Sequence, residues 1–112
     1  MSLGLSAPAS VSVEVQAADR RVFRLTTEVG LGGLLLETAA PFEPGRPVSI
    51  RFALPGSTEW LALDARVVAT GDPSEGEGER GGAALHFLDP PLEVREAVTG
   101  YIAERLGLPP LP

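Results

Sequence analysis

Apolar and polar residues alternate along most of the chain with the period of two that is typical of half-buried β-strands. The alternation is clearest at Val11–Gln16, Val48–Leu54 and Trp60–Thr70. A last strand is predicted at Gly82–Leu88, and the continuous apolar run Leu34–Leu36 predicts a strand that is buried on both faces. These segments recur about every 10 residues, a spacing that favours a small all-β barrel.

A further strand is predicted at Phe23–Val29, after a short polar hairpin turn at Ala17–Arg21. Strict alternation places one set of its side chains on the same face: Phe23, Leu25, Thr27 and Val29. The same alternation places Arg24, Thr26 and Glu28 on the other face.

The C-terminal part of the chain has helical spacing. Asp89 followed by Pro90 and Pro91 predicts a helix start with an aspartate N-cap, and Gly107 predicts its end. The apolar face of this helix comprises Val94, Val98, Tyr101 and Ile102, with Leu106 as a possible extension. Gly100 within the helix costs about 1 kcal/mol relative to alanine, which close packing on the sheet or on a partner would explain.

The predicted architecture is mainly β, with about six antiparallel strands and one C-terminal α-helix that covers an open end of the barrel. One domain is expected for 112 residues. We place a flexible lead at residues 1–10, the barrel and helix at 11–107, and a proline-rich tail at 108–112. Asp72–Gly81 is charged, glycine-rich and without apolar residues, so a mobile hairpin loop is expected there.

Composition excludes several classes of protein. The net charge is −6, which argues against binding to a nucleic-acid polymer, and all 9 basic side chains are arginines. No apolar run approaches the roughly 18 residues of a membrane span, so no membrane insertion is expected. The chain contains no cysteine, which excludes disulfides and thiol catalysis and fits a cytoplasmic location.

Signals of catalysis are weak. His86 is the only histidine and lies within a predicted strand, where a structural role is the common one. The serines at 49, 57 and 74 lack the context of a nucleophile elbow. The glutamates at 75, 77 and 79 lie in a soft loop, whereas acid–base catalysis needs rigid placement. We therefore predict no enzyme, no metal site and no bound cofactor.

A glycine-rich corner lies between the strands at Phe23–Val29 and Leu34–Leu36. Glycines at 30, 32 and 33 occupy three of four consecutive positions. Such glycines allow positive φ angles or close approach to another group, such as a strand, a partner or a ligand. The corner fits neither the Walker pattern nor the dinucleotide fingerprint, because no helix follows it. A bend or bulge between strands is the common reading.

In order and spacing, the chain resembles the PilZ domain, a bacterial six-stranded β-barrel with a C-terminal helix. The resemblance spans about Val11–Leu106 and is carried by Glu28-Val-Gly-Leu-Gly-Gly-Leu-Leu-Leu-Glu-Thr38, by Val48–Leu54, by Ala65-Arg-Val-Val68 and by Gly82–Leu88. It implies a PilZ-like fold and a role in bacterial signalling, motility or type IV pilus function.

Family members that bind cyclic di-GMP use two motifs, and this chain departs from both. For Asp/Asn-x-Ser-x-x-Gly, the chain has Glu28, Gly30 and Gly33, so only the last position is kept. An Arg-x-x-x-Arg motif should precede the first strand, but residues 1–10 contain no arginine. Hydrogen bonds to charged groups contribute about 1.5–3 kcal/mol each, so loss of two phosphate-binding arginines removes on the order of 10²–10⁴ in affinity.

The resemblance and these departures together predict a PilZ-like adaptor that works through other proteins and lacks the standard cyclic di-GMP site. Its candidate partner surface includes Gly32, Tyr101 and Arg105. The alternative is a divergent cyclic di-GMP receptor, which would use Arg20, Arg21 and Arg24 together with Glu28, Gly30 and Gly33. Arg20-Arg-Val-Phe-Arg24 has the letters of the arginine motif but follows the first predicted strand. A small enzyme or carrier would need a deep polar pocket, for which the sequence gives no sign.

Overall fold

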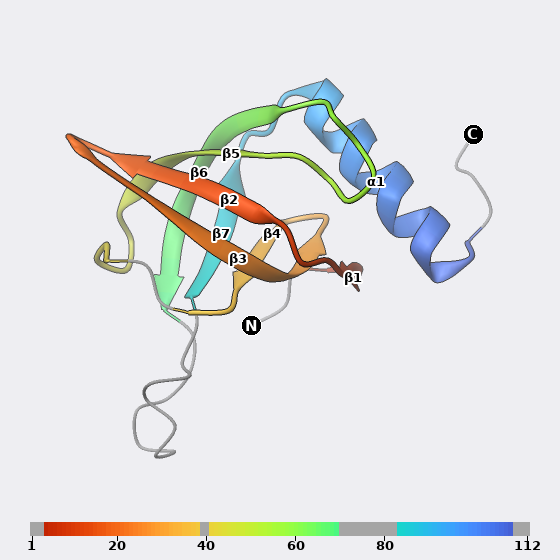
Figure 1. Ribbon diagram of the computed structural model, residues 1–112, viewed down its shortest axis with the longest axis horizontal. Coiled ribbons are helices and arrows are strands. Elements are labelled where there is room, and N and C mark those ends of the chain that lie inside the picture. The colour runs from red at the N-terminus through yellow and green to blue at the C-terminus, as the bar shows by residue number, and fades with distance from the viewer. Residues whose placement is uncertain (1–3, 39–40, 70–82, 109–112) are drawn as a thin grey trace, which may run out of the picture.

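A computed structural model describes residues 4–38, 41–69 and 83–108 and shows a six-stranded antiparallel barrel with one helix (Figure 1). The strands and the helix are β1 (Ser6–Pro8), β2 (Ser12–Ala17), β3 (Arg20–Gly30), β4 (Gly33–Leu36), β5 (Pro47–Phe52), β6 (Leu61–Ala69), β7 (Ala83–Leu88) and α1 (Leu92–Leu106). The barrel order is β3-β2-β5-β6-β7-β4, and pairing of β3 with β4 closes the ring. The predicted fold class is confirmed. The predicted mobile loop at residues 72–81 lies outside the described residues.

The short strand β1 lies within residues 4–10, the described part of the segment at residues 1–10 that was predicted as a flexible lead. Ser6–Pro8 pairs antiparallel with the end of β3, so β1 and β2 form two parts of one broken strand along β3. Thr26 bridges the break, because its buried Oγ1 donates to the Ala9 carbonyl at 2.6 Å and accepts from the Val11 N–H at 3.0 Å. The backbone groups freed by the break therefore remain hydrogen-bonded.

The facing of β3 differs from strict alternation in its first half. The pairing with β4 shifts between Thr26 and Glu28, so Thr27 is the extra residue of a β-bulge. An odd insertion reverses which side chains face the core. Val29 is therefore buried, whereas Phe23 and Leu25 are 58% and 46% exposed, which contradicts the prediction that these three side chains share one face.

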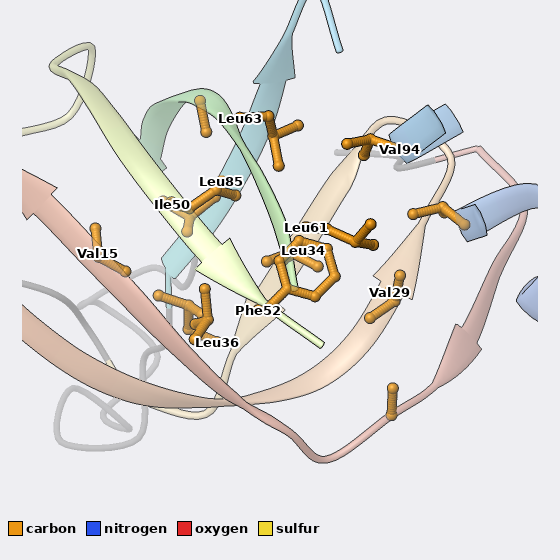
Figure 2. Packing of buried hydrophobic residues seen from close by; sticks show 14 of the residues in the cluster. Val15, Val29, Leu34, Leu36, Ile50, Phe52, Leu61, Leu63, Leu85 and Val94 are labelled. Carbon is orange, nitrogen blue, oxygen red and sulfur yellow. The ribbon is translucent and has the colours of Figure 1, made fainter. Parts of the chain in front are cut away.

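The other strands point their apolar side chains inward as predicted. Figure 2 shows Ile50, Phe52, Leu61, Leu63, Leu34 and Leu85 converging from four strands in the barrel interior. Phe42 packs against this core from the loop before β5. The Phe52 and Phe87 rings stack with their centroids 6.4 Å apart.

Helix α1 packs its apolar face against the barrel, where Val94, Val98 and Ile102 are buried. Gly107 ends the helix in the left-handed conformation, as predicted. The prediction that Asp89 is the N-cap residue is wrong. The N-cap residue is Pro91, which makes no side-chain cap hydrogen bond, and Asp89 has a φ of 45°. The two prolines separate Asp89 from the first turn, because the residue before a proline is disfavoured in helical conformation.

Candidate functional site

The glycine corner is a short connection between β3 and β4. Gly30 and Gly33 are buried at the strand ends, and Gly32 is exposed between them. None of the three has a positive φ, so the corner does not need glycine for its backbone angles. Gly33 is required by close packing, because a Cβ there would overlap the Leu85 carbonyl oxygen of β7. The Gly32 carbonyl accepts a hydrogen bond from the Phe87 N–H at 2.9 Å, which fixes the corner against β7.

Glu28 is held by a hydrogen bond within the chain. The Ser6 hydroxyl donates to Glu28 Oε2 at 2.7 Å, and both side chains are partly buried. Ser6 also pairs with Gly30 in the β1–β3 ladder. The side of the corner that would present an acidic residue to a ligand is therefore lined by β1. Ser6 was not predicted as a site residue, because only the pairing of β1 with β3 brings it next to Glu28.

The N-terminal segment also extends beyond β1 along the corner. The Leu31 N–H donates to the Leu5 carbonyl at 3.0 Å. Both leucines are exposed, at 42% for Leu31 and 53% for Leu5. The corner thus presents a pair of apolar side chains to solvent next to Gly32, rather than polar groups for a phosphate.

The three arginines of the alternative nucleotide site lie toward the other end of β3. Arg20 and Arg21 are at the tip of the β2–β3 hairpin and are exposed. Arg21 pairs with Glu14 of β2 at 3.9 Å. Arg24 is partly buried, and its Nη1 donates to the Phe23 carbonyl at 2.8 Å.

The structure does not bring these arginines and the corner together. At about 3.3 Å per strand residue, Arg20 lies roughly 26 Å from Glu28 along β3, and Arg24 lies roughly 13 Å from it. An arginine at the hairpin tip and Glu28 therefore occupy opposite ends of a long strand, which Figure 1 shows running along the barrel.

Two of the three predicted partner-surface residues meet on α1. The Tyr101 hydroxyl donates to the Pro8 carbonyl of β1 at 2.9 Å. The Arg105 guanidinium carbon lies 5.8 Å from the centre of the Tyr101 ring. Tyr101 thus fastens the helix to β1, and Arg105 lies exposed beside its ring. The third residue, Gly32, is on a different element, in the connection between β3 and β4.

Among residues 4–38, 41–69 and 83–108, no group of three histidine or acidic side chains is placed to hold a metal ion. His86 lies within the β7 ladder opposite Gly33 and Arg66. Within those same ranges, no helix is long and apolar enough to cross a membrane.

The described residues thus form a closed six-stranded barrel whose C-terminal helix is hydrogen-bonded to the N-terminal strand. The family model described as "PilZ domain" matches residues 7–104. The chain belongs to the PilZ family. No curated protein matches it.

Several solved structures share the fold, and they include the following two. The first is the Bacillus subtilis inhibitor of motility (MotI/DgrA), with a TM-score of 0.75 and 19% sequence identity. It aligns with 91% of this chain, and the chain spans only 49% of its length. The second is the PilZ domain of CeSA from a cellulose-synthesizing bacterium, with a TM-score of 0.60 and 22% identity over 91% of this chain and 95% of that one.

Proposed function

We propose that this chain is a PilZ signalling domain that acts by binding another protein, and that it does not bind cyclic di-GMP in the family's standard mode. The observation that supports this proposal is that the glycine corner lacks the polar and basic groups of the family's nucleotide site. Glu28 is engaged by Ser6, Gly30 offers no hydroxyl, and residues 1–10 supply no arginine. A nucleotide phosphate placed there would meet the Glu28 carboxylate, and neither β1 nor the corner at residues 30–33 carries an arginine.

The surface proposed for the partner runs from the corner across β1 to the helix. It consists of Leu5, Leu31 and Gly32 at the corner, with Tyr101 and Arg105 on α1. Exposed leucines beside a Tyr–Arg pair have the composition of a protein interface, in which aromatic residues and arginine are enriched. By analogy with the motility inhibitor that shares the fold, a cytoplasmic partner from motility or pilus regulation is the proposed class.

Site-specific photocrosslinking tests this surface. A photoreactive residue at position 32 should capture one protein in cells of the species that makes the chain. Leu5→Asp with Leu31→Asp should abolish that capture, because charge is costly to bury at an interface without a pairing group. Leu92→Asp is the matched control, since Leu92 is 61% exposed but lies in the first turn of α1, at the opposite end from Arg105. Equal loss with the control, or capture that the double variant leaves intact, would refute the proposed surface.

A further inference from the structure

A second surface, separate from the corner, lies on the outside of the barrel over β3, β2, β5 and β6. It carries three large apolar side chains that are strongly exposed: Phe23 at 58%, Leu25 at 46% and Trp60 at 60%. Trp60 directly precedes β6, and the Arg51 guanidinium of β5 lies 5.4 Å from its ring centre. Tryptophan and arginine are among the residues most enriched at energetic centres of protein interfaces. We call this surface the four-strand face.

The strand register arranges the four-strand face in rows. Glu14 of β2 is opposite Phe23 of β3 on one side and opposite Arg51 of β5 on the other, and Arg51 is opposite Ala62 of β6. The first row therefore consists, in order, of an aromatic, a negatively charged, a positively charged and a small side chain. Its two ends differ in size, and its two central side chains have opposite charges.

The neighbouring row has the same kind of order. Gln16 of β2 is opposite Arg21 of β3 and Ser49 of β5, and Ser49 is opposite Asp64 of β6. The second row therefore consists, in order, of a positively charged side chain, two uncharged polar side chains and a negatively charged side chain. In both rows, each side chain therefore meets one of complementary charge, size or polarity when the row is placed against a copy of itself in reversed order.

A two-fold axis that runs parallel to the strands, between β2 and β5, places each row against its reversed copy. Glu14 then faces Arg51 of the second copy, and Phe23 faces the small Ala62. In the other row, Arg21 faces Asp64. No like charges of these two rows meet in this arrangement. An axis across the strands, along the first row, would instead place Glu14 on Glu14 and Arg51 on Arg51, which costs free energy.

We propose that the four-strand face binds the same face of a second copy of this chain in a symmetric dimer. Such an isologous contact requires a surface that is complementary to itself, which the two rows provide. A shallow hollow of about 450 Å³ borders the second row: Gln16, Ser49 and Asp64 line one side of it, and the rest of its lining lies beyond the row at Ala17, Ala18, Pro47, Val48 and Leu88. In the dimer it receives the Arg21 side chain of the second copy. This inference is independent of the proposed function at the corner.

The expected dimer is weak, because four strands of a convex barrel give a contact at the small end of the range for specific interfaces. A dissociation constant on the order of 10–100 μM is expected. Sedimentation equilibrium up to about 1 mM protein covers that range. Trp60 is the only tryptophan, so its emission should shift to shorter wavelength as the dimer forms and its ring leaves water.

Arg21 and Asp64 provide the decisive test, because they are separated by three strand spacings, or about 14 Å, and cannot pair within one chain. Arg21→Glu and Asp64→Arg should each weaken self-association about tenfold or more, by placing like charges together. Mixing the two variants should restore association. In the mixed dimer, the introduced glutamate faces the introduced arginine at one contact, and the native Asp64 faces the native Arg21 at the other. Each variant alone pairs like charges at both contacts.

The control is Arg95→Glu, which makes the same charge change at an exposed position of α1. It should leave self-association unchanged, and thermal unfolding should show that all variants are folded. Restored association in the mixture supports the dimer. A wild-type chain that is monomeric at about 1 mM, or a dimer that survives both charge reversals, would overturn it.

Discussion

Gly33 is the position at which a single methyl group should damage the barrel most. In Gly33→Ala, the added Cβ overlaps the Leu85 carbonyl oxygen, and it also lies 3.1 Å from the Leu85 carbonyl carbon and 3.2 Å from His86 Cα. All three neighbours are backbone atoms of β7, so no flexible side chain can move aside. The β4 and β7 backbones must separate at the Gly33–His86 pair, which starts their ladder.

The size of the effect follows from the terms involved. Overpacking in a filled interior costs about 1–3 kcal/mol, and each ladder hydrogen bond that is stretched beyond its geometry loses about 0.5–1.5 kcal/mol. The smaller backbone entropy of alanine in the unfolded chain returns about 0.4–1 kcal/mol. The free energy of unfolding should therefore fall by about 2–4 kcal/mol, or roughly 10–25 °C in Tm for a domain of this size.

Gly100→Ala is the matched control, since it makes the same chemical change with the opposite expected sign. Gly100 is exposed in α1, and an added Cβ meets no atom within 4 Å. Packing on the sheet therefore does not explain this glycine, and alanine should raise the unfolding free energy by about 1 kcal/mol. Urea titration of both variants measures the difference. A Gly33→Ala protein within about 0.5 kcal/mol of wild type would refute the close approach of β4 to β7.

Two further substitutions test the side-chain hydrogen bonds that hold β1 and the residues after it in place. Thr26→Val removes the hydroxyl that bridges the Ala9 carbonyl and the Val11 N–H. The free energy of unfolding, measured by urea titration, should fall by about 2–4 kcal/mol because both backbone groups lose their partner. A neutral result would mean that water replaces the hydroxyl. Tyr101→Phe removes the hydrogen bond to Pro8 and should cost about 0.5–1.5 kcal/mol. It should also speed amide exchange in β1, and unchanged exchange there would show that the helix does not fasten this strand.

The sequence alone was sufficient to predict the barrel, because alternation depends only on local side-chain order. The strands at Ser12–Ala17, Pro47–Phe52 and Leu61–Ala69 were found for this reason. The facing of Phe23 and Leu25 could not be predicted, since it depends on an extra residue at Thr27 that is visible only once β3 is paired with β4. Strand β1 was missed because three residues carry too little pattern to identify a strand.

The corner was located by its glycines, but its chemistry depends on long-range contacts. Sequence spacing could not show that Ser6 reaches Glu28, since 22 residues separate them. Nor could it show that Gly33 is enforced by Leu85 of β7 rather than by its own backbone angles. The exposure of Phe23 and Leu25 on the four-strand face likewise became visible only with the bulge in β3.

The most direct test of the central claim is a calorimetric titration of the full chain with cyclic di-GMP at physiological salt. We expect no saturable heat at about 100 μM protein and millimolar nucleotide, because the corner offers a carboxylate held by Ser6 and no arginine. Saturable binding with a Kd on the order of 1 μM, abolished by Arg20→Ala or Arg24→Ala, would contradict the account and establish the divergent receptor instead.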